Sequence, residues 1–512
     1  MTADPGPALA RLVGYALGTG LIRLGDERWA VNRALEVLRL DSPGTYREAQ
    51  ATRLAPDDVL ADLLDDAVAR GLIADTPGQR DLLEAAVLGA LMARPSAVTA
   101  EFWRLYGHSP RAATDAFYKL CVDANYIHAA RSAANPRWEY PSRYGPLDIT
   151  INLAKPEKDP RDIIAAGRAA SAGYPACLLC PQNEGYAGRA DHPARQNLRL
   201  IALELAGEEW VLQYSPYLYY REHCIVLSAE HQPMRLTRAT FGRLLDFEEQ
   251  FPEYFVGSNA DLPIVGGSIL SHDHFQGGRY EFPIQRAGSV ARFAGPAGIA
   301  AEVLEWPLSV LRLTGRDPQS LADAGFALLE AWREHDVPAT EVASRTGSTP
   351  HNTVTPIARR AGRDYQLDVV LRNNRTNATH PEGIFHPHAE IHPVKKENIG
   401  LIEVMGLAVL PGRLAADIPR LAAAVAGAEL AEDLAAHAPM VEQIRAESVR
   451  GSADASREVA QQAVLMAIGE YFTRGLEHCG VLGPAAEAVP HWDALLRPLG
   501  YRRQAEPGPG DR

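Results

Sequence analysis

The chain has 512 residues, 46% of them hydrophobic and 22% charged, and it carries a formal net charge of −13 at pH 7. This length exceeds a single ordinary hydrophobic core, so we expect two or more domains, and the negative charge argues against a protein that coats nucleic acid or an anionic membrane. The lack of a signal-peptide pattern, of an apolar run of membrane-spanning length and of a disulfide framework among five scattered cysteines predicts a cytoplasmic protein.

The first part of the chain has a helical pattern. Apolar residues recur at helical spacing from about Leu9 to Ile127, which predicts a helical packing module without recognisable chemistry. The pattern changes near Tyr140, after which alternating apolar residues predict strands at about 141–153, 197–205, 209–213 and 222–231. A helix is predicted at 241–249.

The second part repeats this succession of strands and helices. A stretch rich in glycine and alanine, residues 287–299, is expected to link two halves; a helix at 320–335, a strand at 364–371, a histidine-bearing strand at 385–392 and helices at about 419–496 follow. The tail from Gln504 should be disordered. We therefore expect an α/β (α+β) fold with a helical segment at 1–139, strand-rich segments at 140–290 and 291–418, and a helical segment at 419–512.

One stretch, Gly266 to Gly278, combines glycine pairs at both ends with two histidines and a glutamine. In a β-strand successive side chains alternate between faces, so His272, His274 and Gln276 would share one face. Glycine pairs fit a backbone that turns sharply or lets a ligand approach. This row suits a phosphate or metal site, although an isolated His-x-His is also typical of a polar surface.

Cys177 and Cys180 are separated by two residues, which is the spacing of a metal knuckle. A redox pair or two buried thiols would have the same spacing, so the pattern alone leaves these alternatives open. A structural zinc needs four ligands, and His231 and His272 are candidates for the other two. Such a closed set leaves no position for water, so the chemistry would come from His274.

These residues resemble the galactose-1-phosphate uridylyltransferases of the histidine-triad-like superfamily. The shared marks are Cys-x-x-Cys-Pro-x-Asn at 177–183, a histidine in the loop after a strand, and His-x-His-x-Gln at 272–276. Class I members read His-Pro-His-Gly-Gln at the last of these, and this chain reads His-Asp-His-Phe-Gln. The stretches at 258–278, 380–388 and 395–414 look like the class II form. The resemblance implies that both strand-rich segments are histidine-triad-like halves.

The resemblance also implies roles for individual residues. His274 would be the nucleophile, Gln276 would hold the transferred phosphate, and Asn183 would belong to the substrate-binding set. The two departures from class I, Asp273 and Phe275, fall on the other face of the strand and should not touch the nucleophile. The implied ligands of a structural zinc are Cys177, Cys180, His231 and His272.

A second polar row at 385–392 would also lie on one face of a strand. Its members are His386, His388, Glu390 and His392. The class I match implies a second metal site there, with His351 and Glu281 as poorly aligned partners, whereas a hydrogen-bonded cluster near the sugar phosphate is the alternative. Arg372 and Arg375 flank two asparagines and either grip a phosphate bidentately or lie in a solvated loop.

The chemistry is consistent with these roles. A neutral imidazole can attack the α-phosphorus at physiological pH, and a sugar phosphate with a second pKa of roughly 6 can leave without a general acid. The implied reaction is ping-pong transfer of UMP from UDP-glucose to galactose 1-phosphate. The implied partners are hexose 1-phosphates and UDP-sugars, and the resemblance is compatible with a homodimer. Alternatives are a nucleotide phosphorylase or hydrolase of the same superfamily and a zinc-stabilised nucleotide- or RNA-binding module, which the acidic balance disfavours.

Overall fold

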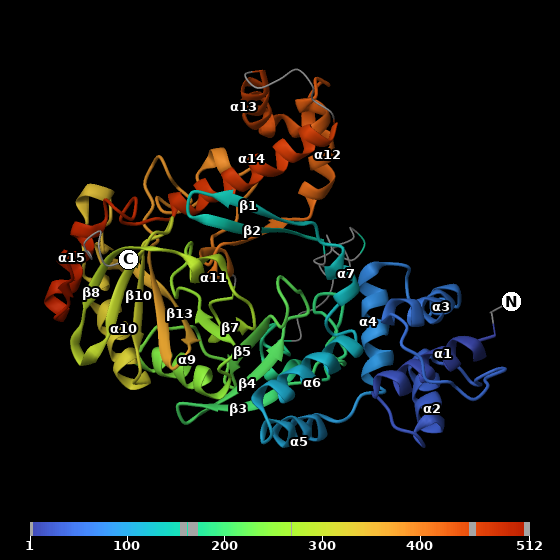
Figure 1. Ribbon diagram of the computed structural model, residues 1–512. Helices are drawn as coiled ribbons and strands as arrows, with labels where there is room; N and C mark the ends of the chain where they lie inside the picture. Colours follow the sequence, from blue (N-terminus) through green and yellow to red (C-terminus); the bar gives the residue numbers. More distant parts are fainter. Residues whose placement is uncertain (1–3, 154–160, 162–172, 268, 450–456, 506–512) are drawn as a thin grey trace. The chain divides into compact units, whose positions relative to one another are not determined.

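The computed structural model describes residues 4–153, 161, 173–267, 269–449 and 457–505 (Figure 1). The chain forms two compact units, one from residues up to Ala134 and from Ala154 to Gln232, the other from Asn135 to Leu153 and from Pro233 onward. Within the described ranges, no helix is both long and apolar enough to cross a membrane. Residues 506–512 of the tail predicted to be disordered lie outside the described residues.

Helices form the N-terminal part of the first unit, which confirms the helical periodicity there. Helices α3 to α6 each begin with a proline, whose fixed φ suits the first helical position and whose missing N–H is not needed there. Before two of these prolines, Thr76 and Ser109 accept backbone N–H bonds from the first turn. The helices are α1 (Gly6–Thr19), α2 (Glu27–Leu38), α3 (Pro56–Ala69), α4 (Pro77–Gly89), α5 (Pro95–Tyr106), α6 (Pro110–Asp123) and α7 (Ala129–Ala133).

These helices enclose an ionisable cluster centred on Glu84, which is 4% exposed. Its Oε1 accepts a hydrogen bond from Asn125 Nδ2 at 2.7 Å and lies 3.7 Å from His128 Nδ1, and its Oε2 lies 3.8 Å from Arg131 Nη2. Burial, reinforced by the negative charge of Asp81, raises the pKa of Glu84 to about 8, and burial lowers the pKa of His128 to about 4. Both side chains therefore favour their neutral forms near pH 7.

The first unit also contains an antiparallel sheet in the order β5–β4–β3. Strands β3 (Ile201–Leu205) and β4 (Glu208–Tyr214) form a hairpin around Ala206 and Gly207. The φ angles of these two residues, 50° and 80°, are those of a type I′ turn, whose twist matches that of the two strands. Strand β5 (Cys224–Ser228) follows, and His231 lies just after it. The strands predicted in this region are confirmed.

The second unit contains a longer sheet whose order is β16–β8–β9–β10–β14–β13–β6–β7, with antiparallel pairing throughout. Helices α9 (Arg238–Gln250) and α10 (Pro318–Arg333) pack against each other and against β13 (Figure 1). The strands are β6 (Phe255–Ser258), β7 (His274–Gly278), β8 (Ser289–Ala294), β9 (Ala300–Leu304), β10 (Val310–Gly315), β13 (Asn352–Ala361), β14 (Asp364–Asn373) and β16 (Arg502–Arg503). The stretch at 287–299, which was expected to link two halves, contains β8, and β8 pairs with β9.

A second small sheet in the same unit joins distant parts of the chain. Strands β1 (Arg137–Ser142) and β2 (Gly145–Asn152) form a hairpin, and β15 (Leu407–Pro411) runs parallel to β2. The hairpin packs on α14 (Figure 1), where Tyr140 donates to Glu470 at 2.6 Å and Trp138 Nε1 donates to the carbonyl of Leu465 at 3.2 Å.

Helices dominate the C-terminal part, as predicted from about 419 onward, and the mixed α/β class is confirmed. They are α11 (Leu401–Val404), α12 (Arg413–Val425), α13 (Ala438–Val449), α14 (Arg457–His478) and α15 (Val489–Leu496). Short 3₁₀ turns and a two-residue hairpin complete the described elements: Pro181–Asn183, Pro283–Arg286, Pro296–Gly298, Pro338–Thr340, Ala389–Ile391, Glu432–His437 and Arg497–Leu499, with β11 (Arg345–Thr346) and β12 (Thr349–Pro350).

Candidate active site

The histidine-rich stretch becomes a strand only at His274, where β7 begins. Strand β7 pairs with β6, so that Phe275 lies opposite Ser258 and Gln276 opposite Gly257. His272 precedes the strand and is fully buried. The strand prediction is therefore confirmed from His274 onward, whereas the residues from Gly266 to Asp273 belong to the loop that leads into it.

His274 has a fixed orientation. Its Nδ1 lies 2.8 Å from the backbone carbonyl oxygen of His272, so Nδ1–H donates and the lone pair is on Nε2. The residue is 6% exposed, and burial lowers the pKa of its imidazole to about 4. A neutral imidazole with its lone pair on a defined nitrogen is the state that a nucleophile requires.

The two departures from the class I motif, Asp273 and Phe275, are both buried. Phe275 is completely buried. Asp273 Oδ2 lies 3.7 Å from Nη1 of Arg243 on α9, and both side chains are mostly buried. The aspartate therefore has a local cationic neighbour within the second unit.

The predicted knuckle brings Cys177, Cys180 and His231 together in the first unit. The two sulfurs are 3.4 Å apart, and Cys180 Sγ lies 3.2 Å from His231 Nδ1. The sulfur separation exceeds the ~2.05 Å of a disulfide and approaches the roughly 3.8 Å that tetrahedral zinc–thiolate bonds imply. Burial, with the neighbouring Cys177 thiol, raises the pKa of Cys180 to about 11, so a cation is needed to stabilise its thiolate. This donor set fits a structural zinc.

Asn183 holds the knuckle in shape. Its Nδ2 donates to the carbonyl oxygens of Cys177 and Cys180, each at 2.8 Å, and its Oδ1 lies 2.7 Å from His192 Nε2. The residue is 1% exposed. Both amide hydrogens are thus used inside the protein. His192 was not among the predicted site residues, because no motif marks a histidine that acts through a neighbouring amide.

The Arg-Asn-Asn-Arg stretch at the end of β14 makes mainly internal contacts. Arg372 is 2% exposed and donates from Nη2 to the carbonyl of Ile399 at 2.8 Å. Arg375 is half-buried and donates to the carbonyl of Glu341 at 2.5 Å. Between them, Asn373 bonds to Asn352 and to the carbonyl of Ala343, and Asn374 bonds to His351.

The strand predicted at 385–392 is wrong. The segment is irregular and ends in the 3₁₀ turn Ala389–Ile391, because Pro387 lacks the N–H that a ladder requires. The four polar residues therefore do not share a face. His351, the expected partner in a second metal site, uses both ring nitrogens in other contacts: one lies 2.8 Å from Asn374 and the other 2.8 Å from Thr346.

Instead, the histidines of this segment separate into two groups, each with ligand atoms within 4.8 Å of one another. One group is Glu382, His386 and His392, and the other is His388, Glu390 and His478. In the second, the ring of His388 is stacked between those of His380 and His478, with centroids 3.9 Å and 4.1 Å apart. His478 belongs to α14, and no local pattern could have predicted it here.

Part of the class II-like stretch at 395–414 is structural. Lys395 Nζ lies 2.5 Å from Glu403 Oε1, and their side chains are only 5% and 9% exposed. The second oxygen of Glu403 accepts the backbone N–H of Gly400 at 2.8 Å and so caps α11. This buried ion pair explains the charged residues without assigning them to a substrate.

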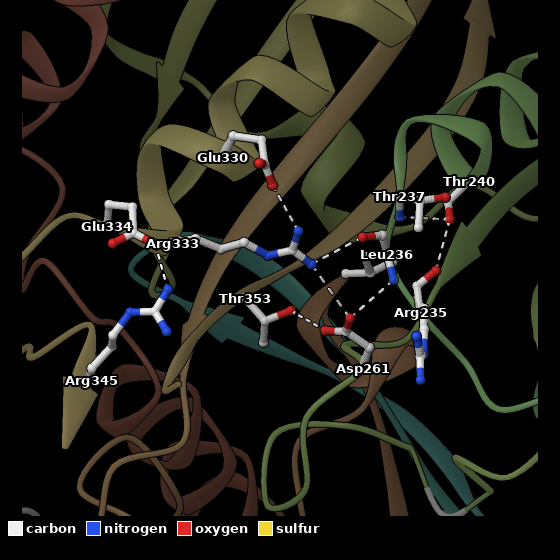
Figure 2. A network of polar contacts seen from close by, with 10 residues as sticks. All are labelled: Arg235, Leu236, Thr237, Thr240, Asp261, Glu330, Arg333, Glu334, Arg345 and Thr353. Carbon is white, nitrogen blue, oxygen red and sulfur yellow. Dashed lines mark hydrogen bonds and ion pairs between the residues drawn. The ribbon is translucent and has the colours of Figure 1, made fainter. Parts of the chain in front are cut away.

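The loop that leads from β6 towards β7 is anchored through Asp261 (Figure 2). Its Oδ1 accepts the hydroxyl of Thr353 at 2.6 Å, and its Oδ2 accepts the backbone N–H of Leu236 at 3.0 Å. Arg333 Nη2 lies 3.6 Å from the same Oδ2 and also donates to the carbonyl of Leu236 at 3.0 Å, while its Nη1 bonds to Glu330 at 2.7 Å. One carboxylate therefore joins the loop to β13, to α10 and to the segment before α9.

Comparison with known proteins identifies the family. Residues 45–233 match the N-terminal domain of galactose-1-phosphate uridyl transferase, and residues 247–438 match its C-terminal domain. The galactose-1-phosphate uridylyltransferase of Halalkalibacterium halodurans is 45% identical over 501 residues, which cover 95% of this chain and 97% of the relative. That of Bacillus subtilis is 45% identical over 504 residues, covering 96% and 98%, and that of Clostridium acetobutylicum is 48% identical over 410 residues, covering 80% and 82%. The chain therefore belongs to the galactose-1-phosphate uridylyltransferase family of enzymes.

Proposed function

We propose that this enzyme transfers UMP from UDP-glucose to galactose 1-phosphate, through a uridylyl intermediate on Nε2 of His274. The names of relatives that match nearly the whole chain support the reaction. The observation that carries the mechanism is the 2.8 Å contact between His274 Nδ1 and the carbonyl oxygen of His272, because it places the lone pair on Nε2.

In the first half-reaction, the Nε2 lone pair forms a bond to the α-phosphorus of UDP-glucose. The bond from that phosphorus to the bridging oxygen breaks, and glucose 1-phosphate leaves with the electron pair. Its second pKa of roughly 6 allows it to leave without receiving a proton. The proton on Nδ1 stays there, and the carbonyl of His272 stabilises the positive charge that the ring gains. In the second half-reaction, a phosphate oxygen of galactose 1-phosphate attacks the same phosphorus and restores the lone pair.

We assign the remaining predicted site residues by their surroundings. Gln276, half-buried on β7, is the proposed donor to the transferred phosphate. Of the two arginines, the half-buried Arg375 is the proposed phosphate contact, and Arg372 holds the Ile399 carbonyl. Asn183 contributes indirectly, by holding the knuckle.

We also propose that a zinc ion is bound by Cys177, Cys180, His231 and His272. The first three have suitable spacing, and His272 is the family match for the fourth ligand. Such a zinc would supply structural stabilisation rather than chemistry, since four protein ligands leave no open position. A thiolate site of this kind suits the reducing cytoplasm, where we expect the enzyme to act.

The test is a single-turnover reaction with UDP-glucose alone. We expect release of one glucose 1-phosphate per active site and acid-labile uridylyl label on the protein, which galactose 1-phosphate then removes as UDP-galactose. His274→Gly should abolish both. His437→Gln is the matched control, because His437 is similarly buried, at 4% exposure, and has no place in the proposed chemistry.

The acceptor decides between this reaction and its alternative. The labelled enzyme is offered galactose 1-phosphate, inorganic phosphate or water in separate reactions. Faster discharge to phosphate or water than to galactose 1-phosphate would identify a nucleotide phosphorylase or hydrolase instead. Retention of normal turnover in His274→Gly would place the nucleophile elsewhere.

A further inference from the structure

The loop between β6 and β7 carries the carbonyl that orients His274. The sheet holds this loop at its ends, where Ser258 pairs with Phe275. Between these ends the carbonyl of Leu270 accepts the backbone N–H of Met234 at 2.9 Å, and a bridge joins Ala260 to Gly266. His272 lies in the loop rather than in the strand, so the position of its carbonyl depends on how the loop is held.

Side chains at the start of the loop provide most of its other fixed points. Asp261 has the three partners described above, on β13, on α10 and before α9. Asn259 accepts the backbone N–H of Leu401 at 3.1 Å, and its amide lies so close to Gly267 that a Cβ there would come within 2.6 Å of Nδ2. The loop is therefore tied to separate elements of the second unit.

Ile264 adds strain to this loop. Its φ is +73°, a left-handed conformation that is unfavourable for a β-branched residue. Its side chain packs against the segment that bears His386: a Cβ on Gly383 would lie 3.0 Å from Ile264 Cγ2 and 2.9 Å from His386 Cβ. Strain of this kind persists only where surrounding contacts enforce it, and it is concentrated at functional sites.

We propose that Asp261 and Ile264 are positioning residues for the nucleophile. Asp261 fixes the start of the loop, Ile264 presses its middle against the His386 segment, and together they place the His272 carbonyl against Nδ1 of His274. This inference rests on the proposed function, because it gives these residues an effect on the rate at which His274 attacks. Neither side chain is assigned a contact with substrate.

The experiment measures the single-turnover rate of glucose 1-phosphate release at saturating UDP-glucose, together with thermal unfolding and zinc content. Asp261→Ala and Ile264→Gly should each slow the step by roughly 10- to 100-fold, the scale expected for a nucleophile misplaced by about 1 Å. The concentration of UDP-glucose that gives half the maximal rate should change less than this. Asp261→Asn, which keeps one carbonyl acceptor, should be intermediate.

Ile264→Gly separates positioning from simple support of the fold. Glycine accepts a positive φ, so the melting temperature should stay the same or rise while the rate falls. A residue that only supports the fold would lower both together. Glu330→Ala is the matched control for the Asp261 network, because it removes the other carboxylate partner of Arg333 without touching the loop; its rate should equal that of the wild type.

The outcomes distinguish this inference from the proposed function. If the wild type releases no glucose 1-phosphate from UDP-glucose alone, the proposed function fails. If the wild type does so and Ile264→Gly reacts at the same rate per folded molecule, the positioning inference is refuted. Should Asp261→Ala not fold, Thr353→Val removes only the 2.6 Å hydroxyl bond from the same carboxylate and should still slow the step; a wild-type rate in that variant also refutes the inference.

Discussion

Replacing Glu84 with glutamine should make the protein more stable, by an amount that grows with pH. Glu84 is 4% exposed, and its pKa is raised from the ordinary 4.5 to about 8 by burial and by the charges of Asp81 and Asp57. Glutamine keeps an Oε1 that can accept the Asn125 hydrogen bond, now 2.7 Å long, but it cannot become charged. The substitution therefore removes the titration and preserves the contact.

The expected size follows from the difference in bound protons. Between pH 4.5 and pH 8 the folded protein keeps a proton that the unfolded chain has released, so the free energy of unfolding falls as pH rises. His128, with its pKa lowered to about 4, acts in the opposite direction only below about pH 6.5. One proton changes the free energy of unfolding by ~1.4 kcal/mol per pH unit. The titration of Glu84 should therefore lower the free energy of unfolding by roughly 2 kcal/mol between pH 6.5 and pH 8.

The assay is urea unfolding of the intact chain, with hydrogen exchange of the α4 amides as a local measure of the same free energy. The difference between Glu84→Gln and the wild type should widen by roughly 2 kcal/mol from pH 6.5 to pH 8. Asp65→Asn is the control, because Asp65 is 67% exposed on the same group of helices and its effect should not vary in this way. A constant difference between Glu84→Gln and the wild type across this range would refute the reasoning.

Three further outcomes are expected. Cys177→Ser should lower the zinc content and the urea midpoint, whereas the burst of glucose 1-phosphate per folded molecule should stay unchanged. Metal analysis that finds no zinc in an active wild type would contradict the ligand assignment. Lys395→Met should cost about 3–5 kcal/mol in urea unfolding, because it leaves the buried Glu403 without its cation, and Lys395→Met combined with Glu403→Leu should recover much of that loss. Arg375→Ala should raise KM for UDP-glucose without moving the urea midpoint; an unchanged KM would remove this residue from the phosphate site.

Local sequence patterns were sufficient to predict those structural features that depend only on residues close together in the chain. Ser109 followed by Pro110 marks a helix start, and the turn at Ala206 and Gly207 marks a hairpin, because caps and turn conformations are determined within a few residues. The same holds for His274 and the knuckle cysteines, whose motif spacing is short. The strand that begins at His274 and the proximity of Cys177, Cys180 and His231 could therefore be predicted, whereas the role of His274 as nucleophile stays a prediction.

Other features depend on residues far apart in the chain. Strand β8 forms in a stretch rich in glycine and alanine because β9 pairs with it, and the row at 385–392 is broken by Pro387. The stacking partner His478 comes from a helix much later in the sequence. The role of Asp261 could not be predicted from the sequence either. It depends on hydrogen bonds to Leu236 and Thr353, which are far from Asp261 in the chain and share no motif with it.

The route of the chain between its two units has a consequence for biosynthesis. Residues 135–153 belong to the second unit but are made in the middle of the first. On the ribosome, β2 emerges long before its parallel partner β15, because Asp148 pairs with Leu407. At a translation rate of roughly 5–20 residues per second, this edge of β2 stays unpaired for on the order of tens of seconds until β15 is synthesised. The nascent hairpin should therefore be a preferred binding site for chaperones during translation, and slower translation should increase aggregation.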